Sequence, residues 1–267
     1  MISNHEQSFP SPPPSKLVQH VRAARRIAVL TGAGMSAESG VPTFRDARQG
    51  MWARFDPAKL ATRQAFERDP AGVWSWHQGH RRDIMRATPN AGHLALREMA
   101  HLDWIEDLTV ITQNIDDLHE RARSPNVIHL HGSLFAAQCS SCGKPHPLPD
   151  CEATSKSLDV QEGPPKCNCC GQMVRPGVIW FGENLPEREW MDAMSCVEQA
   201  DLMLVIGTSG RVQPAALLPE AARRLDCVVW VINPDREAMR PADRSWRAPA
   251  GHAMPALLRE LRVPGCR

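Results

Sequence analysis

Three observations predict an α/β fold built on a doubly wound parallel sheet. Short apolar runs rich in β-branched residues recur at wide spacing, amphipathic stretches separate them, and a glycine turn follows the first run. The five runs are Ile27–Leu30, Leu108–Ile111, Val127–Leu130, Leu202–Ile206 and Val228–Ile232. Runs of this kind are typical of strands that are buried on both faces of a sheet. Strands that alternate with helices indicate a parallel sheet.

The stretches between these runs have helical periodicity. Apolar residues recur every three or four positions at Leu17, Val18, Val21 and Ala24, and again at Ala91, Leu94, Ala95 and Met99. Residues 214–225 are rich in Ala, Leu and Arg and begin with a proline, which a helix tolerates best at its start. We therefore expect helices at all three places.

Two segments interrupt the alternation and are expected to form a smaller lobe. Residues 47–89 read as a helical insertion, and residues 135–174 hold six of the nine cysteines. The dinucleotide-binding domain is then expected to comprise residues 16–46, 90–134 and 175–262. The proline-rich residues 1–15 are expected to form a disordered leader.

Composition narrows the classes of partner. The 267 residues carry 31 Lys and Arg against 30 Asp and Glu, a net charge of +1. This balance gives no electrostatic reason for direct binding of nucleic acid or of an anionic membrane. The sequence contains no apolar run near the roughly 20 residues that a membrane-spanning helix needs. The first residues lack the pattern of an export signal, so a cytoplasmic location is expected.

The glycine turn follows the first predicted strand. Gly32, Gly34 and Ala37 fit the pattern G-x-G-x-x-A, in which the glycines permit a tight turn and close approach to a pyrophosphate. Such turns also serve simply to reverse the chain. A dehydrogenase would show an acidic residue after a second strand about 20 residues on. Residues 40–46 read GVPTFRD instead, so the fingerprint for hydride transfer is incomplete.

Four cysteines have the spacing of a metal site. Cys139 and Cys142 form one C-x-x-C pair, and Cys167 and Cys170 form a second pair after 24 intervening residues. Two such turns can supply four thiolates to one tetrahedral structural zinc. A redox C-x-x-C is the rival interpretation, and Cys169 could replace a neighbouring ligand.

Polar clusters follow three of the predicted strands. They contain Gln113, Asn114 and Asp116, then His131, and then Gly207, Thr208 and Ser209. Ligands of open α/β sheets bind beyond the carboxyl ends of the strands, so these groups are expected to converge. Asn114 and Asp116 suit a ribose, and His131 can exchange a proton near neutral pH.

Together these motifs resemble the sirtuins, which are NAD-dependent protein-lysine deacylases. The matching stretches are GAGMSAESGVPTFRD (32–46), TQNIDDLHERA (112–122), VIHLHGS (127–133), RPGVIWFGE (175–183), GTSGRV (207–212), INPD (232–235) and the two C-x-x-C pairs. They follow the family's order over residues 25–258 and look most like its bacterial and mitochondrial class (class III), associated with acidic acyl groups. The resemblance implies a Rossmann-like domain, a zinc-binding and helical lobe, and a cleft for NAD and acyl-lysine.

The positions of this sequence that match the family's motifs imply its site residues. NAD contacts would be Gly32, Ala33, Gly34, Ala37, Thr43, Phe44, Arg45, Gln113, Asn114, Asp116, Gly207, Thr208, Ser209, Asn233, Pro234, Asp235 and Ala250. The substrate side would include Ala61 and an edge formed by Val178, Trp180, Phe181, Gly182 and Glu183, against which the peptide backbone pairs. One structural zinc would be bound by Cys139, Cys142, Cys167 and Cys170.

The resemblance implies a mechanism in which NAD is consumed as a co-substrate. The acyl oxygen attacks the ribose as nicotinamide leaves, and His131 is the general base for a ribose hydroxyl, supported by Asn114 and Asp116. The products are nicotinamide, O-acyl-ADP-ribose and the free lysine of an acylated protein or peptide. The alternatives are a mono-ADP-ribosyltransferase on the same scaffold and a non-catalytic zinc- and NAD-binding interaction module.

The acyl pocket departs from the family's pattern. Relatives that remove succinyl or malonyl groups carry Tyr-x-x-Arg, and these two positions fall on His77 and His80, while the first arginine, Arg81, comes one position late. Arg81 could reach the pocket if the helix is overwound or bulged; alternatively, His77 and Gly79 open a larger pocket. The sequence leaves both open. A histidine pair binds a carboxylate more weakly than arginine does, so we expect weakened removal of acidic acyl groups and competition from acetyl or longer neutral ones.

Overall fold

The computed structural model describes residues 12–42, 60–148, 163–238 and 244–263. The predictions for residues 1–11 and for Thr43, Phe44 and Arg45 therefore lie outside the described residues. None of the helices in the described ranges is long and apolar enough to cross a membrane.

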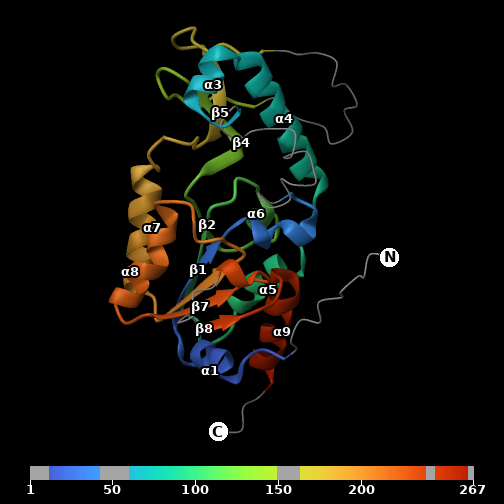
Figure 1. Ribbon diagram of the computed structural model, residues 1–267, viewed down its shortest axis with the longest axis vertical. Coiled ribbons are helices and arrows are strands. Elements are labelled where there is room, and N and C mark those ends of the chain that lie inside the picture. Colours follow the sequence, from blue (N-terminus) through green and yellow to red (C-terminus); the bar gives the residue numbers. More distant parts are fainter. Residues whose placement is uncertain (1–11, 43–59, 149–162, 239–243, 264–267) are drawn as a thin grey trace.

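A six-stranded parallel sheet organises the larger part of the molecule (Figure 1). Its strands are β1 (Arg26–Thr31), β2 (Asp107–Thr112), β3 (Asn126–His129), β6 (Leu202–Ile206), β7 (Val228–Ile232) and β8 (Arg244–Trp246). They lie in the order β3-β2-β1-β6-β7-β8, and Ile27 of β1 sits between Leu108 and Leu202. The predicted fold class is confirmed, and all five predicted strands are present.

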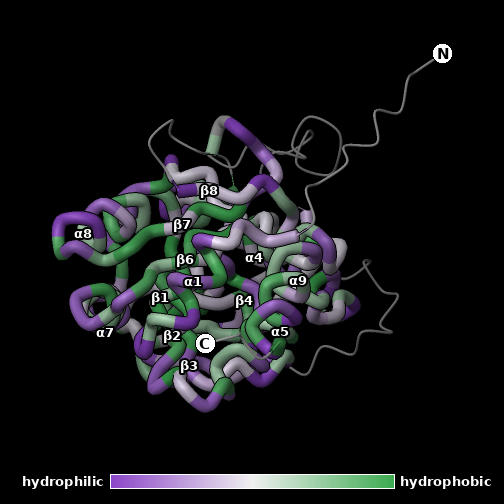
Figure 2. Tube along the Cα trace, turned by 90° about the horizontal axis from the view of Figure 1, so that it is seen from below, coloured by the Kyte–Doolittle hydropathy of each residue, from purple (hydrophilic) through white to green (hydrophobic). Residues whose placement is uncertain are grey.

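Helices cover both faces of the sheet, as the continuous apolar strands require. One face carries α1 (Ser15–Ala23), α5 (Ala91–Met99) and α9 (Ala250–Arg262), and the other carries α7 (Glu187–Gln199) and α8 (Leu218–Arg224). Along β1 the side chains alternate, so Ile27 and Val29 pack with the first group while Ala28 and Leu30 pack with the second. Figure 2 shows the hydrophobic strands between these two helical layers.

The smaller lobe joins a helical segment to a two-stranded antiparallel sheet. It contains α3 (Arg63–Arg68), α4 (Pro70–Arg86), β4 (Gly132–Cys139) and β5 (Val174–Val178). Residues 132–134 and 175–178, which the sequence pattern places in the larger domain, thus lie in this two-stranded sheet. Asp69 caps α4 by accepting the Gly72 amide at 2.9 Å, and Pro70 occupies the first helical position. The segment Pro70–Arg86 is one uninterrupted α-helix. Figure 1 shows α3, α4, β4 and β5 together above the parallel sheet.

Some elements differ from the sequence prediction. The helix predicted at residues 214–225 is present, but it begins as a 3-10 turn (Ala215–Leu217), and the α-helix itself, α8, is shorter than predicted. The third strand ends at His129, one residue before its predicted end. The pattern did not single out β4, β5, β8, α7 or α9. A short helix, α6 (Leu118–Arg121), follows the polar cluster after β2.

Candidate functional site

The polar clusters meet at the carboxyl edge of the parallel sheet. From β1 the chain continues to β2 and β3 on one side, whereas β6, β7 and β8 lie on the other side. The boundary between β1 and β6 is therefore the topological switch point, where open α/β sheets form their ligand crevice. The glycine turn after β1 and the loop after β6 both begin there.

These two loops contact each other backbone to backbone. The amide of Gly34 donates to the carbonyl of Gly207 at 2.8 Å, and the amide of Gly32 donates to Ile206 at 3.0 Å. A Cβ on Gly34 would lie 2.8 Å from the Cα of Gly207, and Gly207 has a φ of +63°. The glycines are therefore required by the packing of the two loops, a reason that the pyrophosphate fingerprint alone does not give.

Behind the glycine turn, Asn114, Ser36 and Asp116 form a buried hydrogen-bonded chain. The Asn114 side chain donates to the Ser36 hydroxyl at 3.1 Å, and that hydroxyl donates to Asp116 Oδ2 at 2.8 Å. Burial raises the pKa of Asp116, and its bonds from Ser36 and the Leu118 amide oppose that rise. Ser36 was not singled out from the sequence, although it lies within the glycine motif.

A second network links the loops after β2, β6 and β7. The Gln113 side chain donates to the Thr208 hydroxyl at 2.9 Å, and the Asn233 side chain donates to the Thr208 carbonyl at 2.9 Å. The carbonyl oxygen of the Asn233 side chain accepts the amide of Asp235 at 3.0 Å. Ser209 and Pro234 lie half-buried beside these groups in the chain. The three loop ends are thus joined in one hydrogen-bonded arrangement.

The start of α9 is joined to the same region. The amide of Gly251 donates to Glu38 Oε2 at 2.5 Å, and Ala250 beside it is buried. Asn90, which caps α5, donates to the Met35 carbonyl at 2.8 Å. Ala33 is half-buried and Ala37 is exposed on this turn. Glu38 and Asn90 are further residues that sequence reasoning missed, because each acts through a partner distant in the chain.

His131 is positioned as a base. Its Nδ1 lies 2.9 Å from the Gln113 carbonyl, and a carbonyl can only accept, so Nδ1 carries the proton and Nε2 keeps its lone pair. Within the described part of the chain, Nε2 has no hydrogen-bond partner. Burial lowers the pKa of His131, and its bond to Gln113 partly opposes this. A neutral imidazole with a free nitrogen can accept a proton at neutral pH.

The predicted substrate edge begins directly beside this histidine. The amide of Ile179 donates to the His131 carbonyl at 2.9 Å, and the amide of Phe181 donates to the carbonyl of Ala61 at 2.9 Å. Val178 and Trp180 are buried, whereas Phe181 is 52% exposed. The edge residues Gly182 and Glu183 complete a turn in which the Glu183 amide donates to the Trp180 carbonyl. The edge thus joins the backbone of the candidate base at Ile179 and carries an exposed aromatic side chain, Phe181, two residues later.

The three residues predicted for the acyl pocket lie on α4 but point to different partners. His77 Nδ1 is 2.8 Å from the Val73 carbonyl, and its Nε2 accepts the indole N–H of Trp180 at 3.4 Å. His80 stacks on Trp76, and the guanidinium of Arg81 lies 5.6 Å from the Phe135 ring centroid. The structure describes α4 as one unbroken α-helix over Pro70–Arg86. A role for Arg81 in the place of the missing arginine stays a prediction.

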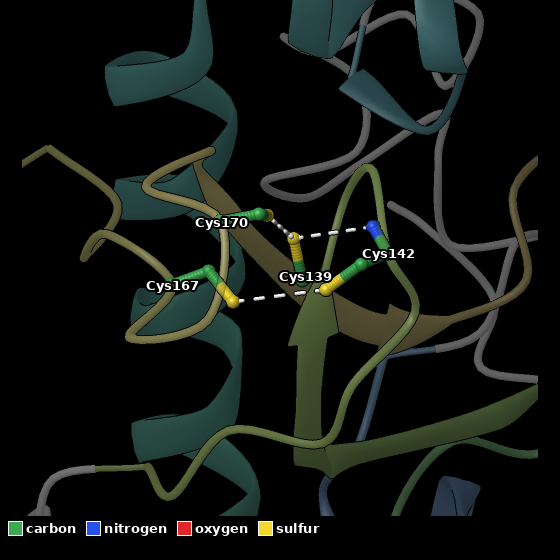
Figure 3. Close-up of side chains that lie close together, drawn as sticks. All are labelled: Cys139, Cys142, Cys167 and Cys170. Carbon is green, nitrogen blue, oxygen red and sulfur yellow. Dashed lines mark hydrogen bonds between the residues drawn. The ribbon is translucent and has the colours of Figure 1, made fainter.

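The four predicted zinc ligands come together in the small lobe (Figure 3). The sulfurs of Cys139 and Cys170 are 3.4 Å apart, those of Cys142 and Cys167 are 3.8 Å apart, and all four lie within 4.8 Å of one another. Zinc–sulfur bonds of about 2.3 Å place the corners of a tetrahedron about 3.8 Å apart. The donor set and its spacing therefore fit one structural zinc, with no position left for a reacting molecule.

Comparison with known proteins agrees with this geometry. A model of the Sir2 family matches residues 32–214. The chain is 45% identical to an NAD-dependent protein deacylase of Corynebacterium glutamicum, with 91% of this chain and 94% of that protein covered. It is 47% identical to an NAD-dependent protein deacylase of Methylococcus capsulatus, covering 92% and 96%.

Solved structures give the same result. The crystal structure of a Sir2 homologue in complex with NAD has a TM-score of 0.83 and 42% identity, with 93% of this chain and 94% of that chain covered. A Sir2 structure bound to a propionylated peptide has a TM-score of 0.75 and 29% identity, covering 92% and 97%. On sequence, fold and zinc site together, the chain belongs to the Sir2 family.

Proposed function

We propose that this protein removes acyl groups from protein lysines with NAD as co-substrate, giving nicotinamide, O-acyl-ADP-ribose and free lysine. The observation that carries the proposal is the state of His131, whose Nδ1 is fixed by the Gln113 carbonyl while Nε2 stays available as a base. The 43–47% identity to curated deacylases over most of the chain supports the same reaction.

The surrounding residues have distinct roles in this proposal. The switch-point loops, with Gly32, Gly34, Thr208 and Asn233, would hold the ADP-ribose part of NAD, and the neighbouring Ala33, Ala37, Gly207, Ser209, Pro234, Asp235 and Ala250 would line it. Asn114 and Asp116, ordered by Ser36, would orient the ribose and nicotinamide. Bound NAD supplies the ribose carbon that the acyl oxygen attacks. His131 would then accept the proton of a ribose hydroxyl.

Product analysis tests the proposal. Purified protein is mixed with NAD and an acetyl-lysine peptide, and nicotinamide and peptide products are quantified by mass spectrometry. We expect one molecule of nicotinamide to be released for each lysine that is deacylated, with the acyl group recovered on ADP-ribose. A peptide that gains the mass of ADP-ribose instead would establish the ribosyltransferase alternative. If the peptide does not change when NAD is present, both enzymatic functions are contradicted, and the non-catalytic interaction module is the alternative that remains.

The proposal extends to an uncharged acyl pocket. Burial lowers the pKa of His77 to about 4, and burial also lowers the pKa of His80, so both rings are neutral at pH 7. Both nitrogens of His77 are already hydrogen-bonded within the protein. Neither position supplies the cation that a succinyl or malonyl carboxylate requires. Neutral acyl groups are therefore the proposed substrates. The space around Gly79, where a Cβ would meet nothing within 4 Å, is compatible with the larger pocket that the sequence suggests.

A panel of acetyl-, succinyl- and decanoyl-lysine peptides of one sequence tests this preference. We expect kcat/KM for the acetyl or decanoyl peptide to exceed that for the succinyl peptide by at least about tenfold at pH 7.5. A preference for succinyl would instead mean that Arg81 or another cation reaches the carboxylate. The variant His80→Arg, which restores the family residue, should raise succinyl turnover selectively.

Two further elements of the proposal concern partners and location. The substrates are acylated proteins or peptides, and direct nucleic-acid binding stays excluded from the proposal because the net charge is +1. Four thiolates that bind zinc must remain reduced, which favours the cytoplasm.

A further inference from the structure

Arg175, on β5, is a buried arginine whose side-chain partners lie at the end of β5 and in the turn that follows it. Its side chain is 9% exposed and forms a two-pronged ion pair with Glu183, with N–O distances of 2.5 and 2.8 Å. One of its nitrogens also donates to the Val178 carbonyl at 2.9 Å. The guanidinium stacks on the ring of Trp180, 3.6 Å from its centroid. Neither the family motif nor the sequence reasoning assigns this arginine a role.

The partners of Arg175 all belong to the candidate substrate edge. Glu183 also accepts the backbone amide of Trp180 at 2.9 Å, so both carboxylate oxygens are engaged inside the protein. The turn is closed by the hydrogen bond from the Glu183 amide to the Trp180 carbonyl, with Gly182 at a φ of +85°. Held from inside in this way, the turn leaves Phe181 52% exposed. The ion pair thus fixes the backbone that presents Phe181.

Trp180 carries the effect of Arg175 to the helical segment. One ring contact is with the guanidinium, a second is with Phe66 at 5.3 Å between centroids, and the indole N–H donates to His77 Nε2 at 3.4 Å. The imidazole of His77 is therefore held between the Val73 carbonyl at Nδ1 and the indole of Trp180 at Nε2. A planar guanidinium can stack and bind a carboxylate through two bonds at once, which an ammonium cannot do.

We propose, on the basis of the deacylase function above, that Arg175 is a positioning residue for the acylated substrate. It holds the turn 180–183 for the peptide backbone and, through Trp180, holds the imidazole of His77 for the acyl group. Its loss therefore weakens the binding of acyl-peptide while the NAD loops at the switch point keep their geometry. Among the residues that the structure describes, the NAD networks share no hydrogen bond with Arg175.

Steady-state kinetics of Arg175→Lys and Glu183→Gln test this role, with zinc content and thermal unfolding measured in parallel. We expect each variant to raise KM for acetyl-peptide by about tenfold and to change KM for NAD by less than about twofold. The double variant should be no worse than the poorer single one, because both remove the same ion pair. The control is Arg188→Lys on α7, an 88% exposed arginine, which should leave both constants unchanged.

Several outcomes would overturn the inference. An unchanged KM for peptide in both variants, or equal increases for peptide and NAD, would mean that the ion pair has only a general structural role. If Arg175→Lys fails to fold, the nearly isosteric Glu183→Gln alone decides by the same criterion. If the wild-type protein deacylates no acyl-peptide, the proposed function itself is refuted. If the wild type is active and both variants keep its KM for peptide, only the role of Arg175 is refuted.

Discussion

The parallel sheet and the small lobe are stabilised by different interactions. On the sheet, strands buried on both faces form two apolar clusters with the helices on either side. The small lobe has smaller apolar clusters, one of which includes Cys139 and Cys167 themselves. A two-stranded sheet such as β4–β5 is marginally stable alone. The lobe therefore depends on its four thiolates and on the Arg175–Glu183 pair.

This difference has a functional meaning. The sheet keeps the switch-point loops in one arrangement through its dry core, so the proposed NAD site has a rigid base. The lobe supplies the turn 180–183 and the helix α4 of the proposed acyl pocket, and polar groups hold these elements. Substrate preference can then change through a few lobe residues, such as His77, while the sheet remains as it is.

Removing a zinc ligand should have the largest effect, and that effect should be confined to the small lobe. Structural zinc contributes roughly 10–16 kcal/mol of binding free energy in small zinc domains. Cys142→Ser should therefore abolish zinc binding, unfold β4–β5 and abolish deacylation, while hydrogen exchange in β1, β2 and β6 stays slow. Cys169→Ser is the control and should retain the metal. Loss of zinc in the Cys169 variant would identify Cys169 as a ligand, and simultaneous loss of protection in the sheet would contradict the independence of the two regions.

Truncation of a side chain in the sheet core should lower the stability of the protein without removing the zinc. Leu204 is fully buried on β6, so Leu204→Ala should lower the free energy of unfolding by about 2–5 kcal/mol. Zinc content of the folded protein should stay at one per chain. Denaturant unfolding and metal analysis measure the two effects, with the 52% exposed Leu225→Ala as control. If Leu204→Ala loses zinc while the protein remains folded, the zinc site of the lobe depends on the sheet core, and the independence of the two regions is contradicted.

Acid should destabilise both regions through buried histidines. Burial lowers the pKa of His77 and of His93 to about 4, and it holds the pKa of His119 well below its ordinary value. Their unfolded pKa is about 6.5, so the unfolded chain binds more protons than the folded chain as pH falls. The stability is fully present above pH 6.5 and should decline between about pH 6.5 and 4. Urea unfolding at pH 7.5, 6 and 5 measures this, and a midpoint that stays constant would contradict it.

Glycine substitutions in α4 should give the smallest effects. Gly79 lies mid-helix with open space around its missing Cβ, so Gly79→Ala should stabilise the protein by roughly 0.5–1 kcal/mol. Gly72 is the matched position in the first turn, where a Cβ would collide with the Asp69 carboxylate that caps the helix. Gly72→Ala should therefore destabilise it. Thermal unfolding of both variants decides, and a stabilising Gly72→Ala would contradict the capping geometry.

The parallel sheet could be predicted because its signal is local. Each run such as Leu202–Ile206 is apolar on both faces and ends in small polar residues, so both strand and site edge are visible in a few residues. The small lobe has no such signal, since β5 contains Pro176 and Gly177 and reads as a loop. Helix α9 contains Pro255 in its interior, which obscures its periodicity.

The site could be predicted where residues lie in contiguous motifs and not where they act through distant partners. Asn114, Asp116 and His131 follow predicted strands, and the four cysteines carry their own spacing. Ser36 contacts Asp116 80 residues away, and Glu38 contacts Gly251 213 residues away. Burial of His77 and its bond to Trp180, 103 residues away, also arise only from the fold. The lowered pKa of His77 follows from this burial and could not be predicted from the sequence.

The most direct test of the central claim is the turnover of His131→Ala with NAD and acetyl-peptide. Without the base, deacylation should fall at least about 100-fold, while zinc content, unfolding temperature and NAD binding stay as in the wild type. His101→Ala, at an exposed histidine on the surface, should turn over normally. Near-normal deacylation by His131→Ala would contradict the assignment of His131 as the base and, with it, the mechanism proposed for this protein.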